Sequence, residues 1–172
     1  MPDRAEPRGA APVGRRRRGP PPFEHVIELH GPALLRFCVA QVGAERAEDV
    51  FQETMLSALR AYEGVRDPAS LRAWLFSIAA RKAIDSHREQ ARSPEPVADP
   101  HVAAPGAEPG AVDHAIWERV RALPAKQREA VALRYLGSLS HREIAQVMAT
   151  SEAAARRNVF EGLNRLRTQL EP

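Results

Sequence analysis

The stretch from Ser140 to Leu166, near the end of the chain, constrains the fold most strongly. Ser140 precedes Glu143 by three residues, which is the capping-box spacing. In that motif the serine hydroxyl accepts from the amide of residue 143, and the glutamate carboxylate accepts from the amide of residue 140. A short helix is therefore expected to begin here. Its apolar side recurs at helical spacing, with Ile144, Val147 and Met148.

A second helix is expected directly after it, because Ser151 is a good N-cap. Its apolar side carries Ala155, Val159, Leu163, Leu166 and Leu170. Two helices joined by about three residues fit a helix-turn-helix, whose second helix meets base edges with its first turns. Arginine pairs bidentately with guanine and asparagine with adenine, and these turns carry Glu152, Arg156, Arg157 and Asn158. An ordinary helical hairpin with solvated arginines fits the spacing equally well, so the pattern alone leaves DNA binding open.

Composition narrows the class of protein. The chain has 172 residues, enough for one domain or two small ones, and only 5% are aromatic, so its core must be mostly Leu, Val, Ile and Ala. This composition favours helices.

Cys38 is the only cysteine, which excludes an intrachain disulfide and fits a reducing compartment such as the cytoplasm. No apolar run approaches the roughly 20 residues of a membrane span, and no apolar segment follows the arginines at 15–18. Neither membrane insertion nor a signal peptide is therefore expected.

Charge and proline content divide the chain into segments. Residues 1–22 carry six arginines against two acids and are expected to form a disordered basic tail. Residues 93–112 are rich in Pro and Ala and hold acids but neither Lys nor Arg, which is typical of a linker. The sequence therefore predicts an all-α protein with two small helical domains, at residues 23–92 and 113–172, joined by this flexible linker.

Four helices are expected in the first domain. Pro32 divides the first apolar run, which predicts a short helix and a second one starting near the proline. An amphipathic helix follows over residues 47–62, with Leu59 and other apolar residues facing inward. Asp67 and Pro68 then combine an N-cap with a proline at the first helical position, and predict a helix that continues to residue 92.

Two helices are expected before the helix-turn-helix in the second domain. Asp113 is expected to cap the first of them, and Pro124 to start the other, which ends near Gly137 as a C-terminal cap. The inward-facing residues of this pair are predicted to be Ile116, Val120, Leu123, Val131, Leu133, Tyr135 and Leu136.

Two polar surfaces of the first domain each admit two interpretations. The polar side of helix 47–62 carries Glu48, Asp49, Gln52 and Glu53. Acids near a helix N-terminus stabilise the helix through its macrodipole, but the same residues could form a docking face. The end of the next helix aligns Arg81, Asp85, Arg88 and Arg92. This stripe could form ion pairs within the helix, or it could offer a basic end to nucleic acid.

Two stretches together resemble one known family. The first is RAEDVFQETMLSAL followed by LRAWLFSIAARKAIDSHRE, and the second is ALPAKQREAVALRYLGSLSHREIAQVMATSEAAARRNVFEGLNRLR. Their order and separation resemble the extracytoplasmic-function (ECF) sigma factors, the two-domain branch of the bacterial sigma-70 family. The resemblance covers residues 24–92 and 114–168, and it implies that core RNA polymerase and promoter DNA are the partners, with an anti-sigma protein as a further one.

The resemblance also implies roles for particular residues. The first domain would dock the polymerase and open the minus-ten promoter element, and the second would read the minus-thirty-five element in the major groove. The polymerase-docking candidates are Asp49, Gln52 and Glu53. The minus-ten candidates lie in the loop from Tyr62 to Ser70 and in the helix after it: Tyr62, Arg66, Arg81, Lys82, Asp85, Ser86 and Arg88. The minus-thirty-five candidates are Ser151, Glu152, Arg156, Arg157 and Asn158.

The chain departs from the family pattern at three places. Ala80 and Arg81 stand where the family often has Arg-Asn, which weakens the expected contact to the melted strand. Ala149 stands where the turn usually has glycine, and a left-handed backbone there would cost about 1 kcal/mol. Phe160 and Glu161 replace residues that are commonly polar or basic, so phosphate contact there should be weaker and Phe160 could pack instead.

Two other classes of function fit the sequence less well. A stand-alone helix-turn-helix regulator explains the second domain but leaves residues 47–92 without a role. An enzyme is disfavoured, because the six histidines are scattered and the sequence has no recognisable nucleophile, metal-ligand cluster or glycine-rich phosphate loop. No catalytic residue, metal, cofactor or small-molecule substrate is therefore expected.

Overall fold

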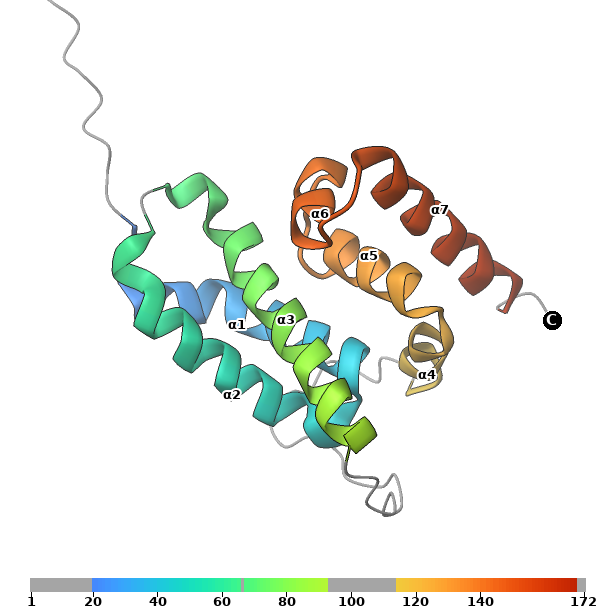
Figure 1. Ribbon diagram of the computed structural model, residues 1–172, viewed down its shortest axis with the longest axis horizontal. Helices are drawn as coiled ribbons and strands as arrows, with labels where there is room; N and C mark the ends of the chain where they lie inside the picture. The colour runs from blue at the N-terminus through green and yellow to red at the C-terminus, as the bar shows by residue number, and fades with distance from the viewer. Residues whose placement is uncertain (1–19, 66, 93–113, 170–172) are drawn as a thin grey trace, which may run out of the picture.

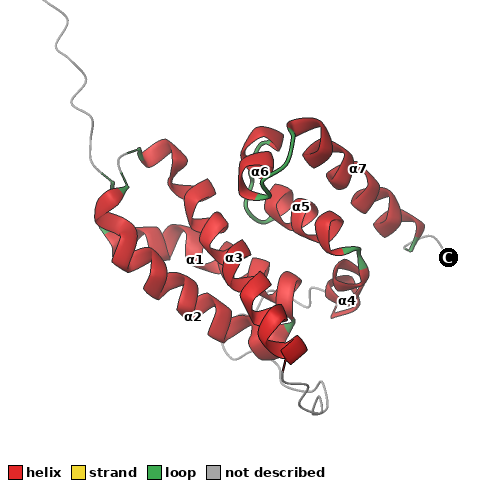
Figure 2. Cartoon of the chain, viewed as in Figure 1, coloured by secondary structure: helices red, strands yellow, loops and turns green. Residues whose placement is uncertain are grey.

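The computed structural model describes residues 20–65, 67–92 and 114–169, and this part of the chain contains helices and loops but no strand (Figures 1 and 2). The first unit has three helices, α1 (Phe23–Val42), α2 (Ala44–Ala61) and α3 (Leu71–Arg92). The second unit has four, α4 (His114–Ala122), α5 (Ala125–Tyr135), α6 (His141–Val147) and α7 (Glu152–Thr168). The predicted all-α class is confirmed. The predicted linker, most of the basic tail, the Asp113 cap and Leu170 lie outside the described residues.

Helix α1 is unbroken although Pro32 lies inside it, so the expected division into two helices is wrong. A proline in a helix interior removes one backbone hydrogen bond and costs about 3 kcal/mol. Both halves of α1 bury apolar side chains in the same core, Val26 before the proline and Leu34 and Phe37 after it. Each such side chain stabilises the fold by roughly 1.5–3 kcal/mol, so the packing outweighs the proline.

Helix α2 begins at Ala44 and turns a line of mostly small side chains inward. The line includes Thr54, whose hydroxyl donates to the Val50 carbonyl oxygen (2.7 Å). A fully buried polar residue is therefore satisfied within its own helix. Leu59, which was expected to face inward, is 52% exposed, because the buried line runs through Thr54 and Ala58 instead.

The start predicted at Asp67 is a 3-10 turn, and the α-helix begins later. The Asp67 carboxylate accepts from the amide of Ala69 (3.0 Å), as a capping residue does. The turn spans Pro68–Ser70, and α3 begins at Leu71. The sequence therefore located the cap correctly but placed the α-helix three residues too early.

The two units pack against each other and share one hydrophobic core. Helix α5 lies against α1, and α6 lies against α3 (Figure 1). Phe76 of α3 is fully buried, and its ring meets that of Phe37 edge-on, with centroids 5.4 Å apart and planes at 78°. Leu133 and Leu139 of the second unit are fully buried in the same core. The sequence had predicted two domains but not this contact between them.

Gly137 allows the turn between α5 and α6 to approach Phe76 closely. A Cβ atom at this position would lie 3.3 Å from Phe76 Cδ1 and only 2.7 Å from the Leu133 carbonyl oxygen. The Gly137 amide donates to the Ala132 carbonyl (3.2 Å), which closes the end of α5 as the sequence predicted. The left-handed residue of the turn is Ser138, with φ 51°.

The inward side of the second unit is narrower than predicted. Leu123, Val131 and Leu133 are buried as expected, but Tyr135 is 59% exposed and Ile116 is exposed as well. Apolar spacing identifies one side of a helix, but only the neighbouring helices decide how much of that side they cover.

Cys38 has the packing role that the sequence predicted. It is fully buried in a small cluster with Val42, Ala47, Val50 and Ala83, which joins α1, α2 and α3. Burial raises the pKa of Cys38 to about 12, so the thiol stays protonated and unreactive. None of the helices in the described ranges combines the length and apolarity that a bilayer crossing needs.

Replacing Gly137 by alanine should lower the free energy of unfolding by about 1–3 kcal/mol, because the added methyl group forces the turn away from Leu133 and Phe76. Gly64→Ala is the matched control, since nothing lies within 4 Å of a Cβ atom at that position. The control should leave stability unchanged or raise it slightly. Urea denaturation followed by circular dichroism measures both. Equal effects of the two variants on the free energy of unfolding would show that Gly137 is not packed closely against Leu133 and Phe76.

Candidate nucleic-acid interface

Helix α6 begins with the capping box that the sequence predicted. The Ser140 hydroxyl accepts from the Glu143 amide (3.3 Å), and Glu143 Oε2 accepts from the Ser140 amide (2.8 Å) and hydroxyl (2.6 Å). These hydrogen bonds lower the pKa of Glu143, and the charge of Arg72 on α3 adds to the effect. The cap therefore orients α6, and its carboxylate also interacts with the charge of Arg72 in the first unit.

The turn between α6 and α7 has the left-handed backbone that the family pattern implied. Ala149 has φ 49°, a conformation that normally favours glycine. The Thr150 amide donates to the Ala145 carbonyl (2.9 Å), which closes α6. The Ser151 hydroxyl then accepts from the Ala154 amide (3.1 Å) and caps α7, as predicted. The predicted helix-turn-helix geometry is therefore present.

The first turns of α7 present the candidate base-reading side chains to solvent. Ser151, Glu152, Arg156 and Arg157 are exposed, and Asn158 is half-buried. Arg156 Nη2 lies 3.1 Å from Glu152 Oε1, and Arg157 Nε lies 4.0 Å from Glu161 Oε1. Exposed pairs of this kind contribute at most about 1 kcal/mol, so the guanidinium groups can exchange them for base edges at little cost.

The opposite side of α7 packs closely on α5. Ala155, Val159 and Gly162 are buried there, and a Cβ atom at Gly162 would lie 2.7 Å from Val131 Cγ2. This close crossing holds the arginine-bearing side of α7 outward. Phe160 is 62% exposed, so the expectation that it packs is wrong: it lies on the solvent side, one position beyond the buried Val159.

The candidate docking residues share the solvent side of α2. Asp49, Gln52 and Glu53 are exposed, while the buried line of the same helix faces the core. Glu53 Oε2 lies 3.1 Å from Nζ of Lys82 on α3. The acidic side of α2 is therefore linked directly to a candidate DNA-contacting residue, which the sequence did not reveal.

The candidate residues on α3 fall into two groups. Arg81, Asp85 and Arg88 are exposed. The spacing permits Asp85 to pair with Arg81 or with Arg88, and among the described residues it pairs with Arg88 (3.6 Å). Ser86 is half-buried, and its hydroxyl and carbonyl oxygens accept from Arg46 Nη1 at 3.1 and 3.3 Å. Ser86 therefore faces the start of α2 rather than the exposed stripe.

Tyr62 lies among aromatic side chains at the end of α2. Its ring centroid is 5.0 Å from that of Phe23 and 6.4 Å from that of Trp74. Its hydroxyl donates to the Pro21 carbonyl, so the last residues of the predicted disordered tail are ordered against it. Burial, and then the charge of Glu24, raises the pKa of Tyr62. Arg66 lies outside the described residues.

The candidate residues thus occupy three surfaces, on α2, on α3 with Tyr62, and on α7. Within the described ranges, no group of three or more His, Cys, Asp or Glu side chains could hold a metal ion. Sequence reasoning missed a cluster of basic side chains between the units, formed by Arg46, His87, Arg121 and Arg128. No sequence signal marks this cluster, because its members come from four helices, and those of the first unit lie more than 30 residues from those of the second.

Two family models match the chain in the order expected. Sigma-70 region 2 matches residues 26–93, and Sigma-70, region 4 matches residues 113–166. The chain is 33% identical over 162 residues to the ECF RNA polymerase sigma factor SigD of Mycobacterium tuberculosis, which covers 86% of this chain and 76% of that protein. The chain belongs to the ECF branch of the sigma-70 family. It is also 30% identical over 154 residues to the RNA polymerase sigma factor CarQ of Myxococcus xanthus, covering 86% and 88% of the two chains.

Solved structures resemble this sigma factor over both units. The sigma factor RpoE of Bartonella quintana, solved in complex with the anti-sigma factor NepR, matches with a TM-score of 0.74 and 26% identity, covering 86% of this chain and 96% of that one. CnrH, solved with the cytosolic domain of CnrY, matches with a TM-score of 0.62 at 23% identity and supports the fold alone.

The function follows from the family. Sigma factors bind core RNA polymerase and direct initiation at promoters, and region 2 accounts for residues that a stand-alone helix-turn-helix regulator leaves unexplained. This protein is therefore a promoter-directing sigma factor. Sigma factors are not enzymes, so the residues that matter are those that bind.

Replacing Ser140 by alanine should lower the free energy of unfolding by about 1 kcal/mol at pH 7, because α6 loses its cap. The lowered pKa of Glu143 means that its contribution is complete above the ordinary glutamate pKa of about 4.3 and is lost as the pH falls through the folded value. The difference between the variant and the wild type should therefore narrow below about pH 4.

The matched control for this measurement is Ser151→Ala. Ser151 caps α7 in the same way, but Ala154 stands where Glu143 stands in α6, so no carboxylate takes part. Its cost should depend much less on pH. Urea denaturation of all three proteins between pH 7 and pH 3 gives the comparison, and parallel curves for the two variants would contradict the assigned role of Glu143.

Proposed function

We propose that this sigma factor docks core RNA polymerase through Asp49, Gln52 and Glu53. The observation that carries the proposal is that all three are exposed on one side of α2 while the opposite side is buried in the core. A surface of two acids and an amide is suited to a basic, hydrogen-bonding partner surface. The Glu53–Lys82 pair (3.1 Å) lets polymerase docking influence the neighbouring DNA-binding side chains of α3.

The minus-ten element is proposed to bind α3 and the loop before it. Taking a base out of the stack costs a few kcal/mol, which stacking on aromatic rings and contacts to phosphates can offset. The aromatic group of Tyr62, Phe23 and Trp74 supplies such rings. The proposed contacts to the melted strand are Tyr62, Arg66, Arg81, Lys82, Asp85, Ser86 and Arg88. The Ser86 hydroxyl can contact DNA only if its hydrogen bond from Arg46 breaks.

The minus-thirty-five element is proposed to bind the first turns of α7. The exposed arginines lie where a recognition helix meets base edges. Arg156 and Arg157 are the proposed base or phosphate contacts, Asn158 is a further base contact, and Ser151 and Glu152 position the start of the helix.

Promoter binding is proposed to separate the two units. The names of the two promoter elements put them about 25 base pairs apart, which is roughly 85 Å at 3.4 Å per base pair. A compact body of this size has a radius of gyration of only about 14 Å, so the packed arrangement cannot read both elements at once. The roughly 20 residues between the units could extend to about 70 Å, which leaves room for that separation.

The packed arrangement is proposed to be the form that an anti-sigma protein binds. RpoE was solved with the anti-sigma factor NepR. Its structure matches both units of this chain, with a TM-score of 0.74. We place the protein in the cytoplasm, where the polymerase acts. Gel filtration with a co-expressed anti-sigma candidate tests the partner directly.

Polymerase docking predicts that Asp49→Arg combined with Gln52→Ala weakens core binding by at least about tenfold, because a basic side chain would meet a basic surface. Glu28→Arg, which reverses an exposed acid on α1, is the control and should bind normally. Fluorescence anisotropy with purified core polymerase measures the affinities. Normal binding by the double variant would remove α2 as the docking surface.

DNA reading by α7 predicts that Arg156→Ala costs about 1–3 kcal/mol on the preferred minus-thirty-five sequence and relaxes specificity at one base pair. Arg165→Ala, at the far end of the same helix, should cost much less. Affinities of the holoenzyme for a panel of single-base promoter variants give both values. A uniform loss on every sequence would assign Arg156 to a phosphate instead of a base.

A further inference from the structure

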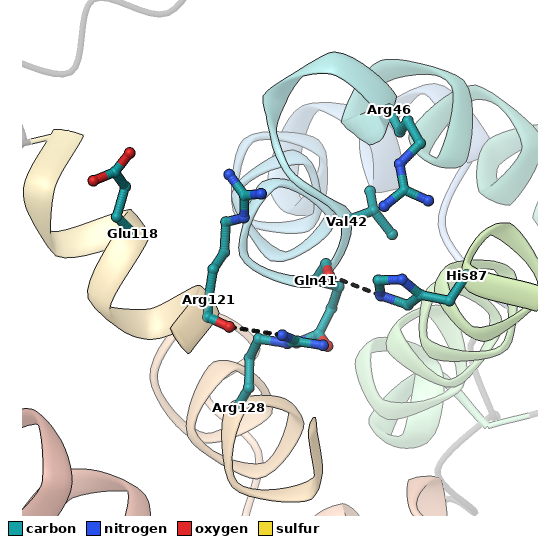
Figure 3. A pocket seen from close by; sticks show the side chains of 7 residues that line it. All are labelled: Gln41, Val42, Arg46, His87, Glu118, Arg121 and Arg128. Carbon is teal, nitrogen blue, oxygen red and sulfur yellow. Dashed lines mark hydrogen bonds between the residues drawn. The ribbon is translucent and has the colours of Figure 1, made fainter. Parts of the chain in front are cut away.

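A cavity of about 320 Å³ lies where the two units meet. The first unit lines it with Gln41, Arg46 and His87, and the second with Glu118, Arg121 and Arg128 (Figure 3). Small-molecule sites in proteins begin at about this size. We call it the arginine cavity. Its walls exist only while the units are packed together.

The charge of the arginine cavity is unbalanced. Three guanidinium groups line it, against the carboxylate of Glu118. The His87 imidazole adds no charge at neutral pH, because burial lowers its pKa. Burial is the main cause that lowers the pKa of Arg46 and of Arg128, and in both cases the positive charge of Arg121 is the next cause. Glu45 and Glu129 lie near Arg46 and Arg128 and offset this only in part. The cavity therefore collects like charges that repel one another.

Two buried hydrogen-bond donors beside the arginine cavity have no acceptor among the residues that the structure describes. Arg128 Nη1 donates to the Arg121 carbonyl oxygen (2.8 Å), but Arg128 Nε is buried without a partner among the described residues. Gln41 is only 7% exposed, and its side-chain nitrogen is likewise unpartnered there. The His87 ring is held at the edge, with Nε2 donating to the Gln41 carbonyl oxygen (3.0 Å). Unused buried donors call for an acceptor.

Gly43 keeps room for the Arg121 guanidinium group. This glycine joins α1 to α2 with φ 84°, a left-handed conformation that disfavours any other residue. A Cβ atom here would lie 3.2 Å from Arg121 Cζ and 3.3 Å from Arg121 Nη2. The guanidinium group from the second unit therefore rests on the bare backbone of the first.

We propose that the arginine cavity binds a small anion that carries phosphate groups. Guanidinium groups match phosphate oxygens with paired hydrogen bonds, and one anion would both accept from the guanidinium groups of Arg46, Arg121 and Arg128 and offset their like charges. Water could accept the hydrogen bonds but would leave the charges uncompensated. The one ring among the described lining residues is the His87 imidazole, which a hydrogen bond ties to the Gln41 carbonyl oxygen, so the described part of the site has no Phe, Tyr or Trp on which a base could stack. Recognition should therefore depend on phosphate number and not on the base.

A ligand in the arginine cavity contacts both units and stabilises the packed arrangement by mass action. By the same linkage it opposes the separation that promoter binding requires. This consequence rests on the proposed function, whereas binding itself rests only on the packing of the two units.

The test is isothermal titration calorimetry of the full chain with inorganic phosphate, pyrophosphate, triphosphate, ATP and GTP. Affinity should rise with the number of phosphates, and ATP and GTP should agree within about twofold. Arg121→Gln should weaken triphosphate binding roughly tenfold or more. Lys126→Gln removes an exposed positive charge from α5 near Arg128 and is the matched control, expected to bind within about twofold of the wild type.

Three outcomes would overturn the proposal. The first is no binding at millimolar concentrations, and the second is an equal loss in the Arg121 and Lys126 variants, which would show non-specific charge attraction. The third is binding that appears only after Glu95, Asp99, Glu108 and Asp113 are replaced by their amides, because the chain's own carboxylates would then be the occupants. The affinity of the Arg121→Gln variant for core polymerase is measured by the same anisotropy assay as the α2 variants. Normal core binding would show that polymerase docking is intact even where anion binding fails.

Discussion

Burial of Phe76 between the two units is the contact on which the rest of the structure depends. Its ring meets Phe37 within the first unit, and the α5–α6 turn closes over it through Gly137 and Leu139. Each unit has only about 55–70 residues, a size at which a separate core is marginal. Sharing one core lets both units bury side chains that neither could cover alone. The same contact also fixes which surfaces remain open to partners.

On the proposed function, the shared core gives this sigma factor two arrangements, one with the units packed and one with them separated. The packed arrangement leaves the outer sides of α2 and α7 exposed but holds them in one compact body. Since the two promoter elements are too far apart for that body, polymerase and DNA must supply more free energy than the separated core loses. A partner that touches both units acts on the same equilibrium in the opposite direction. An anti-sigma protein and an anion in the arginine cavity are two such partners.

Arginines serve two different purposes in this fold, and their surroundings distinguish them. On α7, Arg156 and Arg157 have acidic neighbours on their own helix and remain exposed. The promoter DNA that we propose they contact would therefore displace only weak ion pairs. Between the units, Arg46 and Arg128 both lie near Arg121, and Arg128 Nε has no hydrogen-bond partner in the described part of the chain. Like charges held together without sufficient compensation raise the free energy of the fold. An anion bound in the cavity would lower that free energy, which is why we propose an anion as its ligand.

The sequence by itself determined the helices, the caps and the family. The spacing of Ser140 and Glu143 predicted the capping box, and the match of two ordered stretches predicted a sigma factor, because both signals are local or collinear. It misjudged Pro32, Leu59 and Phe160, because local propensity does not say which neighbour a helix side will meet. Only the tertiary structure decided that Phe76 joins the two units and that Arg46, Arg121 and Arg128 converge. Residues about 80 positions apart meet by packing, and no periodicity along a chain records that.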